Sequence, residues 1–174
     1  CPVTVVFPGS EQTPCTATVT VAGSLNEAVS VTYTNNIQSG GASAEASFAG
    51  DANHSGSSDT ETFQIIQADS VTTISCPTDV AYTGVAIEPC TATVTGAGGL
   101  NEAVAVTYEN NVNAGSASAI AEYFTSANHS GSSDSETFQI TANGLTVAAV
   151  ANDKPYDGTA DATVTLSLTG VLPG

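Results

Sequence analysis

Four cysteines are the residues of this sequence whose spacing points to defined chemistry. Cys1 and Cys15 bound one stretch of chain, and Cys76 and Cys90 bound a second stretch of the same length. Each stretch has the pattern of a short strand, a glycine-centred turn and a returning strand, so its two ends would face each other across an antiparallel hairpin. Directly opposed residues have the close Cβ spacing that a disulfide requires. We therefore predict the disulfides Cys1–Cys15 and Cys76–Cys90.

The cysteine pattern also indicates the compartment. The sequence has no Cys-x-x-Cys pair, and neither of its two histidines lies near a cysteine, which favours disulfides over zinc. Oxidised cysteines predict an extracellular protein. No apolar run is long enough to span a membrane, so we expect no membrane insertion. The chain begins at Cys1 without methionine, which we interpret as a processed product or an excerpt of a longer protein.

The charge of the chain is strongly one-sided. Seventeen acidic residues stand against one basic residue, Lys154, and the formal net charge is −16. Binding to nucleic acid is excluded, because no cationic patch can form to neutralise phosphates. Adhesion to anionic membrane surfaces is excluded for the same reason. Such a charge favours a soluble, self-repelling protein.

Two histidine loops are the nearest approach to a catalytic pattern. His54 and His129 lie in identical Asn-His-Ser-Gly-Ser-Ser-Asp segments, 53–59 and 128–134. Residues adjacent in sequence rarely converge as a Ser-His-Asp triad, and an oxyanion hole is not evident. Because Asn, Ser, Gly and Asp form turns, a turn motif explains these segments better. Asn53 and Asn128 also match the N-glycosylation pattern, and we expect both on exposed loops.

A cluster of carboxylates near the first histidine loop could bind calcium. It consists of Asp51, Asp59 and Glu61. The second copy has Ser126 in place of Asp51, and the spacing differs from that of an EF-hand loop. We therefore predict no metal, cofactor or catalytic site, and we leave calcium or glycan decoration open.

These residues belong to an internal repeat of 75 residues. Shifting the sequence by that length aligns Cys1 with Cys76 without a gap, and about 41 of the 75 positions are identical. Apolar residues alternate with Thr, Ser and other polar residues along short segments bounded by turn residues, which predicts strands. The residues expected to face inward are Val3, Val5, Phe7, Cys15, Ala17, Val19, Val21, Val29, Val31, Tyr33, Ala42, Ala44, Ala46, Phe48, Phe63, Ile65, Val104, Val106, Tyr108, Ala117, Ala119, Ala121, Tyr123, Phe138 and Ile140.

The composition agrees with an all-β protein that has small cores. Hydrophobic residues make up 41% of the chain, mostly Val and Ala, while Met and Trp are absent. One polar face per strand is typical of an antiparallel β-sandwich. We predict one repeat over residues 1–75, a second over 76–146, and the opening strands of an incomplete third over 147–174. Because the join at 66–75 is short and both repeats are acidic, we expect them to lie end to end.

The last segment, residues 151–174, lacks a core of its own. An isolated two-stranded unit is marginal in water. Together with the strand before it, this segment offers only a half-core: Val147, Val150, Val164, Leu166 and Leu168. It could be an excerpt of a further repeat, exchange strands with a neighbouring chain, or pack on the second repeat as a cap. We favour the excerpt.

A pattern of short motifs recurs through the second repeat: Tyr82-Thr83-Gly84, Pro89-Cys90-Thr91-Ala92-Thr93-Val94-Thr95-Gly96, Val106-Thr107-Tyr108, Asn110-Asn111, Ala127-Asn128-His129-Ser130-Gly131-Ser132-Ser133, Phe138 and Ile140. This pattern resembles bacterial immunoglobulin-like repeats, of the glycine-rich type found in tandem in very large surface proteins and adhesins. Gly144-Leu145-Thr146-Val147 followed by Lys154-Pro155-Tyr156-Asp157-Gly158-Thr159 is similar to the opening of the related YDG-type repeat. The resemblance implies immunoglobulin-like sandwiches in series, a stalk or spacer role at the bacterial cell surface, and no catalytic residues.

Two functions follow as hypotheses. The first is a structural or adhesive repeat region of an extracellular bacterial protein, whose partners are further repeats or other copies of the chain. The second is a carbohydrate- or ligand-binding module, with surface glycans or a neighbouring cell as partners. The second needs exposed aromatic platforms, yet the chain has five Tyr and five Phe, most of them at inward positions. An enzyme has no supporting constellation. A glycan array would separate the first two hypotheses.

Overall fold

Strands account for nearly all the regular structure of this chain. The computed structural model describes residues 1–21, 25–161 and 163–170. In these residues the elements are strands β1 to β15 and one short 3-10 turn, η1 (Ala97–Gly99). The expected all-β class is therefore confirmed. By compactness the chain divides into a first unit, residues 1–73, 92–105 and 121–134, and a second unit, residues 74–91, 106–120 and 135–174.

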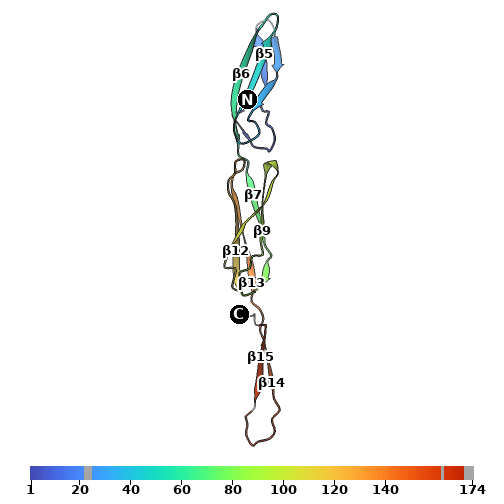
Figure 1. The fold of residues 1–174 in the computed structure, drawn as a ribbon, viewed down its shortest axis with the longest axis vertical. Coiled ribbons are helices and arrows are strands. Elements are labelled where there is room, and N and C mark those ends of the chain that lie inside the picture. The colour runs from blue at the N-terminus through green and yellow to red at the C-terminus, as the bar shows by residue number, and fades with distance from the viewer. Residues whose placement is uncertain (22–24, 162, 171–174) are drawn as a thin grey trace. The chain divides into compact units, whose positions relative to one another are not determined.

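The first repeat forms two sheets. One has the strand order β1-β6-β5-β4, and the other pairs β2 with β3. The two longest strands, β5 and β6, lie side by side (Figure 1). The bounds are Thr4–Val6 for β1, Ala17–Val21 for β2, Leu25–Val29 for β3, Val31–Thr34 for β4, Gly40–Gly50 for β5 and Ser55–Ile66 for β6.

The second repeat forms the same sheets with one strand added. One sheet has the order β11-β12-β13-β8 and the other the order β10-β9-β7, so β7 (Ser70–Ser75) lies beside β9. β7 precedes Cys76, where we expect the second repeat to begin, and it pairs with β9 of that repeat. The remaining bounds are Asp79–Ala81 for β8, Thr91–Gly96 for β9, Leu100–Val104 for β10, Val106–Glu109 for β11, Gly115–Tyr123 for β12 and Ser132–Thr141 for β13.

Small residues face large ones in the core of the first repeat. In the β5–β6 ladder Ala42 stands opposite Phe63, and in the β4–β5 ladder Ala44 stands opposite Tyr33. The alanines leave room for the aromatic rings, which meet edge to face with centroids 6.3 Å apart. Two residues that we expected to face inward are instead exposed: Val3, at 81%, precedes β1, and Val21, at 43%, is the last residue of β2. The buried residues of this core are Phe7, Cys15, Ala42, Ala44, Phe63, Ile65 and Ala68.

The expected hairpin between the cysteines of each repeat is wrong. β1 pairs in parallel with β6, with Val5 opposite Ile65, and β8 pairs in parallel with β13. The returning segment is held by a loop instead: the Gln12 amide donates to the Asn36 carbonyl, and the Asn36 side chain donates to the Gln12 carbonyl at 2.7 Å. The first strand satisfies its backbone groups on the long β6, which a short hairpin across Pro8 could not offer.

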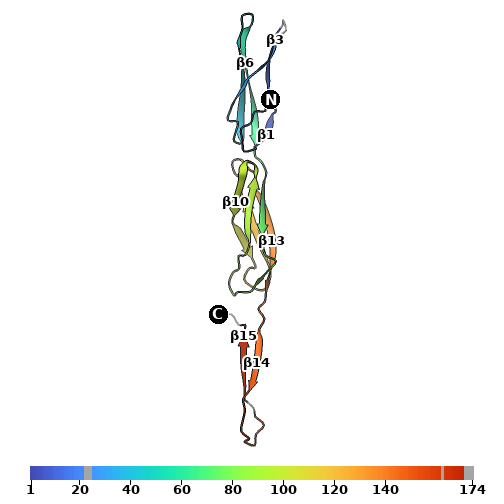
Figure 2. The same ribbon diagram turned by 90° about the vertical axis from the view of Figure 1, so that its right-hand side faces the viewer.

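The last segment forms a two-stranded antiparallel hairpin of β14 (Thr146–Ala151) and β15 (Val164–Thr169), visible in Figure 2. Every residue of both strands is exposed, including Leu166 at 69% and Leu168 at 53%. The alternative in which these leucines are buried against the second repeat as a cap is therefore wrong. Residues 162 and 171–174 of the expected third repeat lie outside the described residues.

Candidate functional site

The two disulfides are the first feature to place. Cys1 is bonded to Cys15 and Cys76 to Cys90, with Cα–Cα distances of 4.4 and 4.3 Å, and these are the pairs expected from the sequence. Cys76 follows the last residue of β7 directly, and Cys90 immediately precedes β9. The bond therefore fastens the point where the chain leaves one sheet for the other. Two such bonds indicate an oxidising environment.

A tyrosine holds the backbone of each second cysteine. The Tyr33 hydroxyl donates to the Cys15 carbonyl and accepts from the Cys15 amide, both at 2.9 Å. Tyr108 makes the same two bonds to Cys90, at 3.0 and 2.9 Å. From the sequence we expect both tyrosines only to face inward. Each repeat places a tyrosine at the same separation, 18 residues, from its second cysteine, and this spacing is the signal that could have identified the contact.

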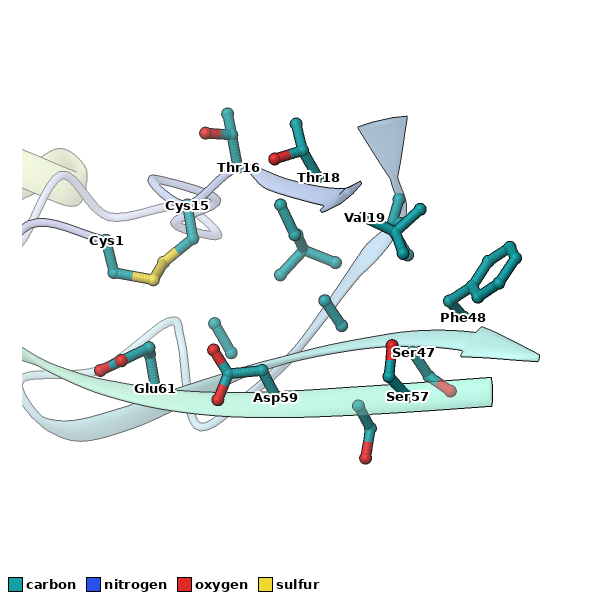
Figure 3. Close-up of a pocket in the computed structure, with 16 residues that line it drawn as sticks. Cys1, Cys15, Thr16, Thr18, Val19, Ser47, Phe48, Ser57, Asp59 and Glu61 are labelled. Atoms are coloured by element: carbon teal, nitrogen blue, oxygen red, sulfur yellow. A yellow bond between two sulfur atoms is a disulfide. The ribbon is translucent and has the colours of Figure 1, made fainter. Parts of the chain in front are cut away.

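An open gap between β2 and β6 is one of several concave features of the first repeat. Figure 3 shows β2 on one side, β5 and β6 on the other, and the Cys1–Cys15 disulfide at one end. Its volume is about 540 Å³. The lining is mixed: Ala17 and Val19 are apolar, while Ser57 and Asp59 of β6 offer a hydroxyl and a carboxylate. Such a surface can take a ligand that is partly apolar and forms hydrogen bonds along its length.

The first histidine loop closes the β5–β6 turn. Asp51 accepts hydrogen bonds from the amides of Asn53 and His54, and its carboxylate lies 2.8 Å from His54 Nδ1. The hydrogen bond from the His54 side chain, followed by that from the Asn53 amide, lowers the pKa of Asp51. These contacts are those of a turn, which is how we interpreted the motif from the sequence.

The carboxylates that we considered for calcium are divided between two places. Asp51 is committed to the turn, whereas Asp59 and Glu61 line the gap. Within residues 1–21, 25–161 and 163–170, no three His, Cys, Asp or Glu side chains form a group that could hold a metal ion.

The second histidine loop has the same sequence but a different environment. His129 is 8% exposed, meets the Phe7 ring edge to face at 5.4 Å, and has Nε2 2.8 Å from the Ala97 carbonyl oxygen. These three residues all belong to the first unit. Identical segments thus serve as an open turn in one copy and as a packing element in the other.

Asn128 is not on an open loop, contrary to our expectation. Its side-chain oxygen accepts from the Ser39 amide at 2.9 Å, and its side-chain nitrogen donates to Gln38. A glycan on that nitrogen would disrupt the bond to Gln38. Asn53, by contrast, is exposed, so only this acceptor motif keeps the predicted setting.

Lys154, the single basic residue, lies in the loop between β14 and β15. Its ammonium lies 2.9 Å from an Asp157 carboxylate oxygen and donates to the Thr159 hydroxyl and the Asp161 carbonyl. The hydrogen bond from Lys154 lowers the pKa of Asp157. The lysine therefore serves loop structure in the second unit.

Two aromatic side chains are exposed, Phe124 at 74% and Tyr156 at 98%.

No helix in the described residues is long and apolar enough to cross a membrane.

No family model, no curated protein and no solved structure matches this chain.

Proposed function

We propose that this chain is a non-enzymatic structural or adhesive repeat region of a bacterial protein that is exposed outside the cell. The observation that carries the proposal is the recurrence of one structural plan. Each repeat has a first strand in parallel pairing, a disulfide at the same two positions, and a tyrosine bonded to the second cysteine. Repetition of a plan without a repeated reactive group is what a spacer needs.

The chemistry of the repeats supports this proposal. The disulfides fit an oxidising, extracellular setting. The net charge of −16 keeps neighbouring copies apart and soluble. Small alanine-rich cores contribute little burial, so a covalent clamp in each repeat offsets that weakness.

The test is the location and size of the native protein in its source cells. Antibodies raised against residues 1–140 should label cells that have not been permeabilised, and the mass of the native molecule should exceed that of this chain. Label that appears only after permeabilisation would contradict an extracellular role. The control is an antibody against an internal protein, which must not label intact cells.

We also propose that the repeats are immunoglobulin-like and lie end to end, because acidic surfaces repel lateral contact. Small-angle scattering of the chain at low salt tests this arrangement, and it should give the profile of an elongated particle. A compact profile would contradict it.

The exposed Phe124 favours a ligand-binding module as the second candidate, since a solvent-facing ring can stack on a sugar. A glycan array probed with the chain and with the variant Phe124→Ser separates the two functions. Binding that is lost in the variant would support the module, and no binding by either would support the spacer.

A further inference from the structure

The open gap lies where the second repeat holds a strand. In the second repeat β9 is flanked by β7, and in the last segment β15 is flanked by β14. β14 occupies nearly the same place in the repeat as β7, because a shift of 75 moves residues 70–75 onto 145–150. β2 corresponds to β9, yet within the described residues its sheet contains only β3. The edge of β2 that is not paired with β3 has no partner strand in the described residues, and Ala17 and Val19 of β2 line the gap.

Burial shows what the added strand does. Val94 of β9 is 0% exposed and Ala92 is 6% exposed, whereas the equivalent Val19 and Ala17 of β2 are only half-buried. The residue types at each pair of positions are identical, so a difference in neighbours must cause the difference in burial. β7 is the neighbour that β9 has and β2 lacks. An added strand like β7 would therefore bury the apolar side chains of β2.

The polar side chains that line the gap also indicate that a strand like β7 fits there. In the second repeat the Ser132 hydroxyl lies 2.8 Å from the hydroxyls of both Ser70 and Thr72 on β7, and Ser70 donates to the Ser130 carbonyl at 2.6 Å. The residue equivalent to Ser132 is Ser57, which is exposed and lines the gap. The first repeat therefore presents the same hydroxyl that binds β7 in the second.

We propose that the gap between β2 and β6 binds one extended strand of a partner polypeptide by β-strand addition. The strand is of the β7 type: hydroxyl or β-branched residues point inward at alternate positions, as Ser70, Thr72 and Ile74 do at 8%, 5% and 5% exposure. An open strand edge supplies backbone hydrogen bonds, and the alternate side chains supply specificity. Because Asp59 and Glu61 line the gap, the inward residues of the strand are not acidic. Strand addition at this gap does not depend on where the protein resides.

A synthetic peptide with the sequence of residues 67–75 is the probe. Added to the ¹⁵N-labelled chain, it should cause saturable shifts of the amide signals of β2 and β6, and leave those of β14 and β15 unchanged. Two peptides of equal charge serve as the matched pair. Thr72→Asp places a carboxylate on the inward face and should weaken binding about tenfold or more. Val71→Asp changes a residue that is 59% exposed in β7 and should bind like the parent peptide.

Two variants of the chain test the site itself. Ser57→Gln fills the gap and should weaken binding of the parent peptide, whereas Thr60→Gln, also exposed on β6 but outside the lining, should not. Both positions are exposed, so both variants should keep the fold, which their thermal unfolding verifies.

A strand joined covalently to the chain distinguishes two questions: whether the gap accepts a strand, and whether that strand comes from a partner polypeptide. The sequence of residues 67–75 joined ahead of Cys1 should raise the unfolding temperature by about 4 °C or more. Stabilisation by the joined strand without binding of the free peptide would overturn the partner proposal. Failure of both would show that the gap does not accept a strand. A concentration-dependent dimer that excludes the peptide would assign the gap to a second copy of the chain and would also overturn it.

Discussion

The hydroxyl of Tyr33 lies 2.9 Å from both the amide nitrogen and the carbonyl oxygen of Cys15. One side chain thereby satisfies both backbone groups of a residue that is 8% exposed and bonded to Cys1. The ring of the same tyrosine packs edge to face on Phe63. Tyr108 and Cys90 repeat the relationship. The tyrosine thus connects the disulfide to the aromatic core of each repeat.

The variant Tyr33→Phe tests this connection. It keeps the ring and removes the hydroxyl, leaving the amide and carbonyl of Cys15 without that partner, which should lower the free energy of unfolding by about 1–3 kcal/mol. Chemical denaturation of the oxidised chain measures the change. Tyr156→Phe is the control, because Tyr156 is 98% exposed and should show no change. Equal losses from both variants would mean that the Cys15 bonds contribute nothing.

The two histidines provide a second comparison, because their local sequences are identical. His129→Ala removes the edge contact with Phe7 and the hydrogen bond to the Ala97 carbonyl, and should cost about 1–2 kcal/mol of stability. His54→Ala acts at an exposed turn and should stay within about 0.5 kcal/mol of the parent. Thermal unfolding of both variants measures this difference. If His54→Ala were the more damaging change, the packing role of His129 would be wrong.

Removal of the first disulfide should destabilise the protein through the unfolded state. The double variant Cys1→Ser/Cys15→Ser frees a loop of 14 residues' separation and should lose about 3 kcal/mol of unfolding free energy. Denaturation curves of the variant and parent measure the loss.

Peptide mapping under non-reducing conditions is the companion experiment for the disulfides. It should recover Cys1 linked to Cys15 and Cys76 linked to Cys90. A peptide that links Cys15 to Cys76 would contradict the pairing.

The pKa of Asp51 should depend on the hydrogen bonds within its turn. Hydrogen bonds from His54 and Asn53 lower the pKa below the usual 3.8. A carboxyl with a depressed folded-state pKa contributes stability above its unfolded value, and the contribution is lost as the pH falls through the folded value. The relevant window therefore lies at and below pH 3.8.

An NMR titration of the Asp51 carboxyl carbon measures this pKa. In His54→Ala the Asp51 pKa should rise toward its usual value, because the largest of the lowering contacts is gone. The pKa of Asp157, which is lowered by Lys154, should not move and serves as the internal control. An unchanged Asp51 pKa in the variant would show that the hydrogen bonds from the backbone amides are sufficient to lower this pKa.

Much of the local structure could be predicted because successive side chains of a strand alternate between the buried and the exposed face of the sheet. Ala42, Ala44, Phe63 and Ile65 were placed inward from alternation alone, and all four are buried. Val3 failed because alternation continues past the end of a strand, where the sheet no longer covers the side chain. The gap could not be predicted, since it depends on which strand lies beside β2.

The sequence by itself determined the repeat and the all-β class, because residue identity and side-chain period are local properties of the chain. The predicted cysteine pairs are present, although the hairpin from which they were predicted does not form. Only the tertiary structure decided that β1 pairs in parallel with β6 and that β7 lies beside β9. Only the tertiary structure gave His54 and His129 different surroundings. The physical reason is that strand pairing and contact partners join residues distant in the chain, and identical segments such as 53–58 and 128–133 carry no record of what packs against them.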